Sequence, residues 1–183
     1  ELGYELYVKL KDTKKIYELI VEVGKNFNLS NCGVHTMDVM RMESGFLHWG
    51  QDISPDENQY EAGLNFAISY KKNVKFIGRD TLLNIKDKKL KKRFVMLCLK
   101  ESNPGEPLLL HDEPIYLDDK IIGVTTSGNF SFNYNKNLSF GYINSELSNE
   151  KLSNENLYIE IEKNKCPAEI LLKPLKQTDF KNL

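Results

Sequence analysis

The sequence has few of the features that mark a membrane protein, a secreted protein or a nucleic-acid-binding protein. No run approaches the roughly 20 apolar residues that span a bilayer, and the first residues resemble no secretory leader. The 183 residues carry 25 basic and 26 acidic side chains, a formal net charge of -1. Without a long apolar run we expect no membrane, and without a basic surplus we expect no nucleic-acid partner. A small, locally recognised ligand is favoured.

Cysteine is also scarce, and its three copies are far apart, at Cys32, Cys98 and Cys166. No Cys-x-x-Cys pair or Cys/His cluster brings metal ligands together, so no metal site is predicted. We interpret all three as buried, reduced thiols. Such thiols are typical of a reducing compartment, which means the cytoplasm, or the mitochondrial matrix in a eukaryote.

The chain begins at Glu1 without an initiator methionine, and strand-like alternation is already under way over residues 1–8. This start predicts a fragment of a longer protein. The pattern of the following 80 residues is mixed. Its predicted elements are a strand over 1–8, a helix from Asp12 or Thr13 to Gly24, a helix over 36–44, a strand over 63–70 and a helix starting after Gly78.

From Arg93 onward the period changes to short apolar runs separated by Pro, Gly, Asn and Asp. Strands are predicted at 94–99, 114–117, 120–125, 138–143, 157–162 and 166–172. We therefore predict an α+β chain with a boundary near Leu90. Residues 1–90 would form part of an α/β domain, and residues 91–183 an antiparallel half that closes as a small β-barrel.

Two side chains stand out as candidate ligand contacts. Glu5 has a carboxylate that can accept two parallel N–H bonds from a pterin or another amidine-like edge, although a solvated edge carboxylate is the simpler interpretation. Trp49, the only tryptophan, offers a flat surface for a heteroaromatic ring, or else closes the core. His48 can act as an acid or base, but no nucleophile is identifiable beside it. Asp38 and Arg41, three residues apart on a helix, are expected to pair with each other or to cap neighbouring backbone.

Several ordered motifs resemble the folate-binding domain of the glycine-cleavage T-protein (aminomethyltransferase) family and its C-terminal barrel. They lie at 1–8, 38–43, 45–50, 52–55, 61–64, 76–79, 123–128 and 140–142. The His48-Trp49-Gly50 triplet, with residues 126–132 and 136–140, is similar to the dimethylglycine and sarcosine dehydrogenase branch. Where T-protein has an arginine before the aspartate of the second helix, this chain has Met37.

The resemblance implies an α/β folate-binding domain followed by a β-barrel, around a tetrahydrofolate site. The glutamate that holds the pterin falls on Glu5, and the tyrosine that lines the site falls on Tyr7; with Trp49 these are the predicted cofactor-binding residues. The catalytic aspartate of the family lies upstream of Glu1, so no catalytic residue is expected here. FAD is likewise expected only in the upstream part of the parent protein.

The implied function is that of a tetrahydrofolate-binding fragment of an enzyme like dimethylglycine or sarcosine dehydrogenase. Such an enzyme oxidises an N-methyl glycine on a flavin and passes the one-carbon unit to tetrahydrofolate. The alternatives are an aminomethyltransferase that acts on a lipoyl carrier protein, and a non-catalytic folate-binding or assembly protein of the same fold. Expected partners are folate and a small N-methyl amine. Self-association is expected if half of the folate domain is missing.

Overall fold

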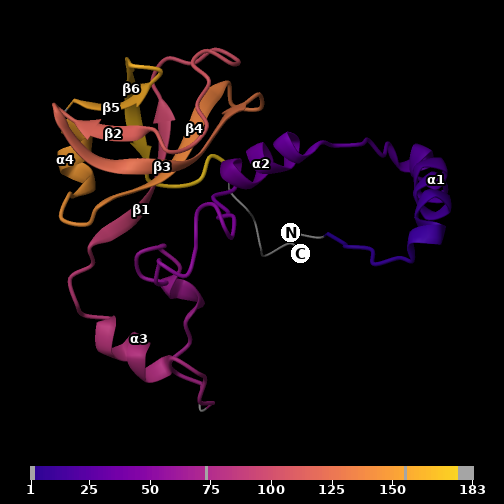
Figure 1. The fold of residues 1–183 in the computed structure, drawn as a ribbon, viewed down its shortest axis with the longest axis horizontal. Helices are drawn as coiled ribbons and strands as arrows, with labels where there is room; N and C mark the ends of the chain where they lie inside the picture. Colours follow the sequence, from indigo (N-terminus) through magenta and orange to yellow (C-terminus); the bar gives the residue numbers. More distant parts are fainter. Residues whose placement is uncertain (1–2, 73, 155, 177–183) are drawn as a thin grey trace. The chain divides into compact units, whose positions relative to one another are not determined.

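The computed structural model describes residues 3–72, 74–154 and 156–176 (Figure 1). Its contacts divide the chain into two compact units. The first contains the described residues up to Met37, and the second contains those from Asp38 onward. Among the described residues, no helix is long and apolar enough to cross a membrane.

In the first unit, a short 3-10 helix, η1 (Leu10–Asp12), leads into α1 (Thr13–Gly24), which η2 (Lys25–Phe27) follows. The predicted helix is confirmed as α1. The 3-10 helix η2 continues from it and ends at Asn28, whose φ of 56° is left-handed. The strand predicted over 1–8 is wrong for residues 3–8, which have no regular secondary structure, and residues 1 and 2 lie outside the described ranges. A strand requires a backbone partner, and no described residue pairs with this segment.

The helix α2 (Val34–Glu43) begins in the first unit and ends in the second. After it, the chain forms loops, the 3-10 helix η3 (Asn65–Ala67) and α3 (Arg79–Ile85). The helix α3 follows Gly78, whose φ of 85° is left-handed, where the sequence predicted its start. The strand predicted over 63–70 is wrong. Its backbone closes local turns instead, including Leu64 N–H to the Gln59 carbonyl at 2.8 Å and Ala67 N–H to the Leu64 carbonyl at 3.0 Å.

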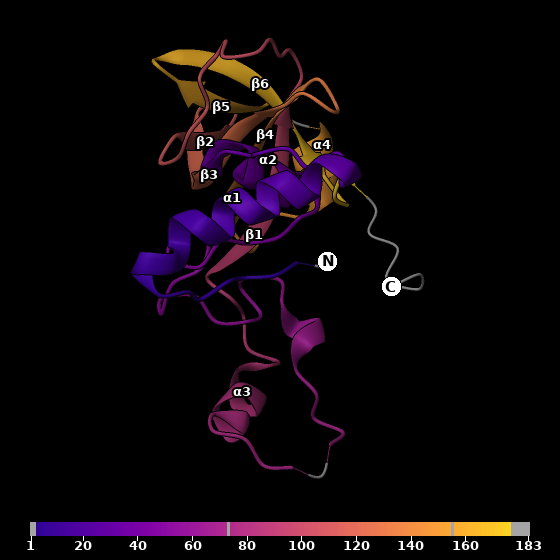
Figure 2. The ribbon, with the colours of Figure 1, turned by 90° about the vertical axis from the view of Figure 1, so that its right-hand side faces the viewer.

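The rest of the second unit is a closed barrel of six antiparallel strands, which confirms the predicted β-barrel (Figure 1, Figure 2). Its strands are β1 (Lys92–Leu99), β2 (Pro114–Leu117), β3 (Lys120–Ser131), β4 (Lys136–Asn144), β5 (Leu157–Ile161) and β6 (Asn164–Leu171). They are hydrogen-bonded in the order β1-β4-β3-β2-β5-β6. The strand β3 continues past the predicted end at Thr125, with a register shift between Thr125 and Ser127. A short helix that was not predicted, α4 (Asn149–Asn154), precedes β5.

Two apolar clusters hold the second unit together. The larger contains side chains from β1, β2, β4, β5 and β6, among them Leu97, Ile115 and Ile159. The smaller joins Met42 of α2 to Cys98, Leu138 and Phe140 on β1 and β4. Burying each large apolar side chain contributes about 1.5–3 kcal/mol. The smaller cluster therefore fixes the C-terminal turn of α2 against the outside of the barrel, which sets the position of the polar groups beside it.

Candidate functional site

The first unit brings two of the predicted cofactor-binding residues together. The Tyr7 hydroxyl donates a hydrogen bond to Glu5 Oε2 at 2.6 Å, and both side chains are exposed. This bond to a carboxylate raises the pKa of Tyr7, because it stabilises the protonated phenol. Within the described residues, this is the one hydrogen bond that the Glu5 carboxylate accepts, so most of its acceptor positions remain unused. Glu1 lies outside the described residues.

In the second unit, Trp49 is exposed to 68%, which excludes the interpretation that its indole closes the core. The indole projects from a tight loop. Gly50 N–H donates to the Ile53 carbonyl at 2.7 Å, and Asp52 N–H donates to the His48 carbonyl at 2.8 Å. Gly50 has a φ of 89°, a conformation in which a side chain is strained. The loop therefore presents a flat aromatic surface to solvent.

This loop forms one wall of a cleft of about 690 Å³. The lining residues are His48, Trp49, Gly50, Gln51, His111, Asp112 and Thr126. The two histidines come from loops far apart in the sequence, and His111 Nδ1 lies 2.7 Å from Asp112 Oδ2. The volume falls in the range of about 300–1,000 Å³ that is typical of small-molecule sites.

Behind the loop lies a buried carboxylate, Asp52, which the sequence did not single out as a site residue. Its side chain is 0% exposed and accepts four hydrogen bonds. The donors are Arg41 Nη1 at 2.6 Å, the His48 backbone N–H at 2.8 Å, Thr126 Oγ1 at 2.6 Å and Ser127 Oγ at 2.7 Å. A carboxylate has about four acceptor positions, so these bonds satisfy it.

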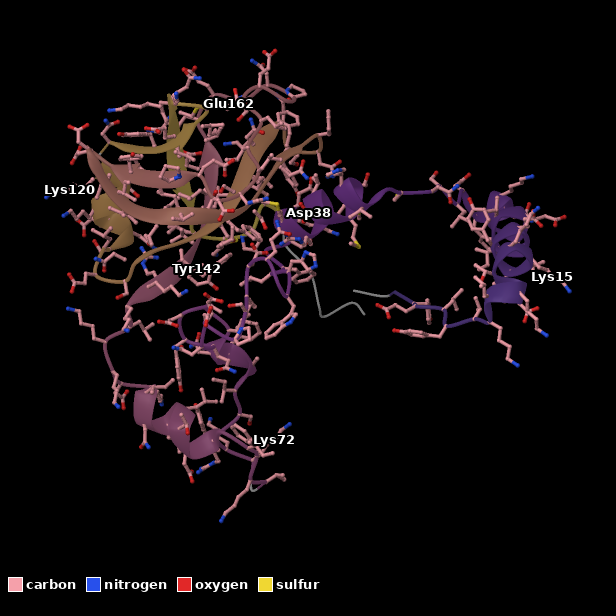
Figure 3. The ribbon with its side chains drawn as sticks, viewed as in Figure 1. Lys15, Asp38, Lys72, Lys120, Tyr142 and Glu162 are labelled. Atoms are coloured by element: carbon pink, nitrogen blue, oxygen red, sulfur yellow. The ribbon has the colours of Figure 1, made fainter. Side chains whose placement is uncertain are left out.

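Arg41 connects this carboxylate to α2. Its Nε donates to Asp38 Oδ1 at 2.6 Å, which confirms the predicted pair, and its Nη2 donates to Ser127 Oγ at 2.8 Å. The guanidinium also lies over the Phe140 ring, 5.7 Å from its centre. On the other side, the Tyr142 hydroxyl donates to the Asp52 backbone carbonyl at 2.9 Å, and burial raises the pKa of this phenol. Asp38 and Tyr142 are labelled in Figure 3.

The cysteines do not contribute to either set of residues. Cys98 is buried, Cys166 is half-buried and Cys32 is exposed. The prediction that all three are buried is therefore confirmed at Cys98, only partly met at Cys166 and wrong at Cys32. Cys32 lies in a loop, and the residues on either side of it are exposed too. A single cysteine among polar loop residues has no apolar neighbours in the sequence that would bury it. The described residues contain no group of three or more His, Cys, Asp or Glu side chains suited to a metal ion.

Comparison with known protein families gives two matches, in order along the chain. The model described as the GCVT N-terminal domain matches residues 1–72. The model described as the glycine cleavage T-protein C-terminal barrel domain matches residues 92–176. These two matches together cover most of the sequence.

Individual relatives give the same picture. The chain is 34% identical over 179 residues to mitochondrial dimethylglycine dehydrogenase of Rattus norvegicus, covering 98% of this chain and 20% of the relative. It is 33% identical over 174 residues to the aminomethyltransferase of Listeria welshimeri, covering 95% of this chain and 45% of the relative. The crystal structure of aminomethyltransferase T from Bartonella henselae matches with a TM-score of 0.74 at 20% identity, over 89% of this chain and 44% of that one. The chain thus spans about a fifth of the dehydrogenase it matches, and the structural match shows the fold alone.

Proposed function

The chain belongs to the glycine cleavage T-protein family, and on this premise we propose that it is the tetrahydrofolate-binding part of an enzyme like dimethylglycine or sarcosine dehydrogenase. In this proposal residues 1–90 belong to the folate-binding domain and residues 91–183 form the barrel domain. The parent enzyme would pass a one-carbon unit from an N-methyl glycine to tetrahydrofolate. It would act in the cytoplasm, or in the mitochondrial matrix of a eukaryote.

The observation that carries the proposal is the exposed Glu5 carboxylate with the Tyr7 hydroxyl on one of its oxygens at 2.6 Å. A pterin presents neighbouring N–H groups along one edge, and an ionised carboxylate accepts such groups in parallel. The Tyr7 bond takes one of about four acceptor positions of the carboxylate, so both oxygens can still accept an N–H group from the ligand. These residues therefore fit the donor pattern of a pterin.

Trp49 is proposed separately as a stacking surface for a heteroaromatic ring. Its indole is exposed, it lines the cleft, and its loop is closed by backbone hydrogen bonds. An aromatic ring that stacks on an indole gains about 1–3 kcal/mol, a range measured for nucleic-acid bases. This supports a role in ligand binding more than a role in packing.

Bound tetrahydrofolate would supply the amine that accepts the one-carbon unit. The residues described here would hold and orient it; the flavin that oxidises the N-methyl amine is expected in the upstream part of the parent. Holding an acceptor near an electrophile lowers the barrier mainly by removing its translational and rotational freedom. The chain's proposed contribution is therefore binding and orientation.

An aminomethyltransferase is the second candidate, because the Listeria relative is similar over 95% of this chain. Met37, at the position where T-protein has arginine, favours the dehydrogenase branch. A flavin absorbance spectrum of the purified parent protein separates the two candidates. A parent that binds folate without turning over any methylated amine or lipoyl carrier would instead be a binding or assembly protein.

Calorimetric titration of tetrahydrofolate into the chain tests the proposal. We expect saturable binding that Glu5→Gln weakens about 10- to 100-fold, because one charge-assisted hydrogen bond is worth about 1.5–3 kcal/mol. Glu22→Gln is the matched control, since it removes the same charge from an exposed position in the same unit. Equal affinity of Glu5→Gln and wild type would refute the role of Glu5, and no binding by the chain or by its parent would refute the function.

A further inference from the structure

We propose that Asp52 is the positioning residue of the Trp49 loop, and that its buried carboxylate fixes the indole on the wall of the cleft for a heteroaromatic ligand. The identity of that ligand as a folate rests on the proposed function. The positioning itself rests on contacts within the second unit.

The first step is the bulge in β3. Thr126 and Ser127 are consecutive, and consecutive side chains in a regular strand point to opposite faces. Here both hydroxyls donate to the same atom, Asp52 Oδ1, at 2.6 and 2.7 Å. The register shift between Thr125 and Ser127 is what turns both hydroxyls to one side. The bulge in β3 therefore places two neighbouring hydroxyls on the Asp52 carboxylate.

The second step is the closure of the loop on that carboxylate. Asp52 Oδ2 accepts the His48 backbone N–H at 2.8 Å, and the Asp52 N–H donates back to the His48 carbonyl at 2.8 Å. Trp49 directly follows His48 in this closed segment. Arg41 Nη1 then ties the same oxygen, Oδ2, to α2 at 2.6 Å. The backbone of Trp49 is thereby fixed to α2 and to the barrel through one side chain.

The third step concerns the exposed indole. Trp49 is 68% exposed, so packing does little to hold the indole, and the backbone of the loop determines the position from which it projects. A binding surface held in place before the ligand arrives loses less conformational freedom on binding. Loss of the Asp52 contacts is therefore expected to loosen Trp49 and to weaken any ligand that stacks on it, while the apolar barrel interior remains.

The single tryptophan makes a direct experiment possible, because all indole fluorescence of the chain comes from Trp49. We compare Asp52→Asn with Asp112→Asn, which removes an exposed carboxylate from the same cleft. Circular dichroism first checks that both variants keep the barrel. Fluorescence anisotropy and acrylamide quenching then report the mobility and access of the indole in the ligand-free chain. Titration with tetrahydrofolate follows.

We expect Asp52→Asn to lower the anisotropy of Trp49 and to raise its quenching. We also expect it to weaken the binding of tetrahydrofolate about ten-fold, because one or two side chains must then be ordered on binding. Asp112→Asn is expected to match wild type in the ligand-free readouts. A folded Asp52→Asn variant with wild-type anisotropy and quenching would overturn the proposal. If wild type binds no tetrahydrofolate, the proposed function fails, but the ligand-free comparison still decides whether Asp52 positions the loop.

Thr126→Val serves if Asp52→Asn does not fold. Valine keeps the shape of threonine and removes one of the four donors to the carboxylate. A smaller change in anisotropy in the same direction is expected. Unchanged anisotropy and quenching in Thr126→Val, with Asp52→Asn unfolded, would mean that the carboxylate only stabilises the fold, which overturns the positioning role.

Discussion

Arg41 and Asp52 form the most deeply buried ion pair among the described residues, with side chains 12% and 0% exposed. Removing one partner from such a pair leaves the other charge inside the protein without full compensation. We predict that Asp52→Ala lowers the free energy of unfolding by about 3–5 kcal/mol, measured by urea denaturation. Asp112→Ala, whose side chain is 82% exposed but whose φ of 63° is left-handed, should change it by no more than about 1–2 kcal/mol. Equal losses in the two variants would contradict this account.

The three thiols are predicted to differ in reactivity. Burial, with the hydrogen bond to Glu169, raises the pKa of Cys98 to about 12, so almost none of it is thiolate at pH 8. Burial also raises the pKa of Cys166, whereas Cys32 is exposed. Timed alkylation with iodoacetamide, read by mass spectrometry, should modify Cys32 first, Cys166 slowly and Cys98 only after denaturation. Early labelling of Cys98 in the folded chain would contradict the structure.

At the scale of elements, the approach of β3 to β4 depends on glycine. A Cβ on Gly123 would lie 2.0 Å from the Tyr142 carbonyl oxygen, which is backbone and cannot move aside. We predict that Gly123→Ala destabilises the chain by at least about 2 kcal/mol, measured by urea denaturation. Gly33, where a Cβ meets open space, is the control, and Gly33→Ala should cost less than about 1 kcal/mol. Comparable stability of the two variants would show that β3 and β4 lie further apart.

Elements whose signal is local were predictable from the sequence. The helix α1 has an apolar face and a glycine near its end, and the barrel strands are short apolar runs between turn residues. The strand predictions that were wrong failed because a strand forms only where another strand pairs with it. Residues 3–8 and 63–70 have strand-like composition but no strand partner among the described residues, and local turns use the backbone donors near Leu64 instead. The extension of β3 past Thr125 is stabilised by pairing with β4, which a single strand does not reveal.

The candidate site shows the same limit. The Asp38–Arg41 pair was predictable because its spacing is local, and it is confirmed at 2.6 Å. The link from Asp52 to Thr126 and Ser127 was missed, because 74 and 75 positions separate the partners in the sequence. The only available signal was that both segments lie in motifs of the family. The ligand roles of Glu5, Tyr7 and Trp49 remain predictions.

At the scale of the whole molecule, α1 has no buried residue, and its apolar stripe includes Leu19 at 56% and Val23 at 51% exposure. Exposed apolar stripes of this kind bind other apolar surfaces. We predict that the chain binds an apolar dye and self-associates as its concentration rises, measured by light scattering. Replacing Leu19 and Val23 by lysine should reduce both, whereas Lys15→Gln should not. A strictly monomeric chain without dye binding would contradict this prediction.

The central claim, that the chain recognises the pterin of tetrahydrofolate through Glu5, is tested most directly by comparing two ligands in one calorimeter. Tetrahydrofolate carries the pterin, and p-aminobenzoyl-glutamate is the same molecule without it. The account predicts that wild type binds tetrahydrofolate at least about ten-fold more tightly than the pterin-free ligand, and that Glu5→Gln loses most of this difference. Equal affinity of wild type for both ligands, or a preference that survives in Glu5→Gln, would contradict it.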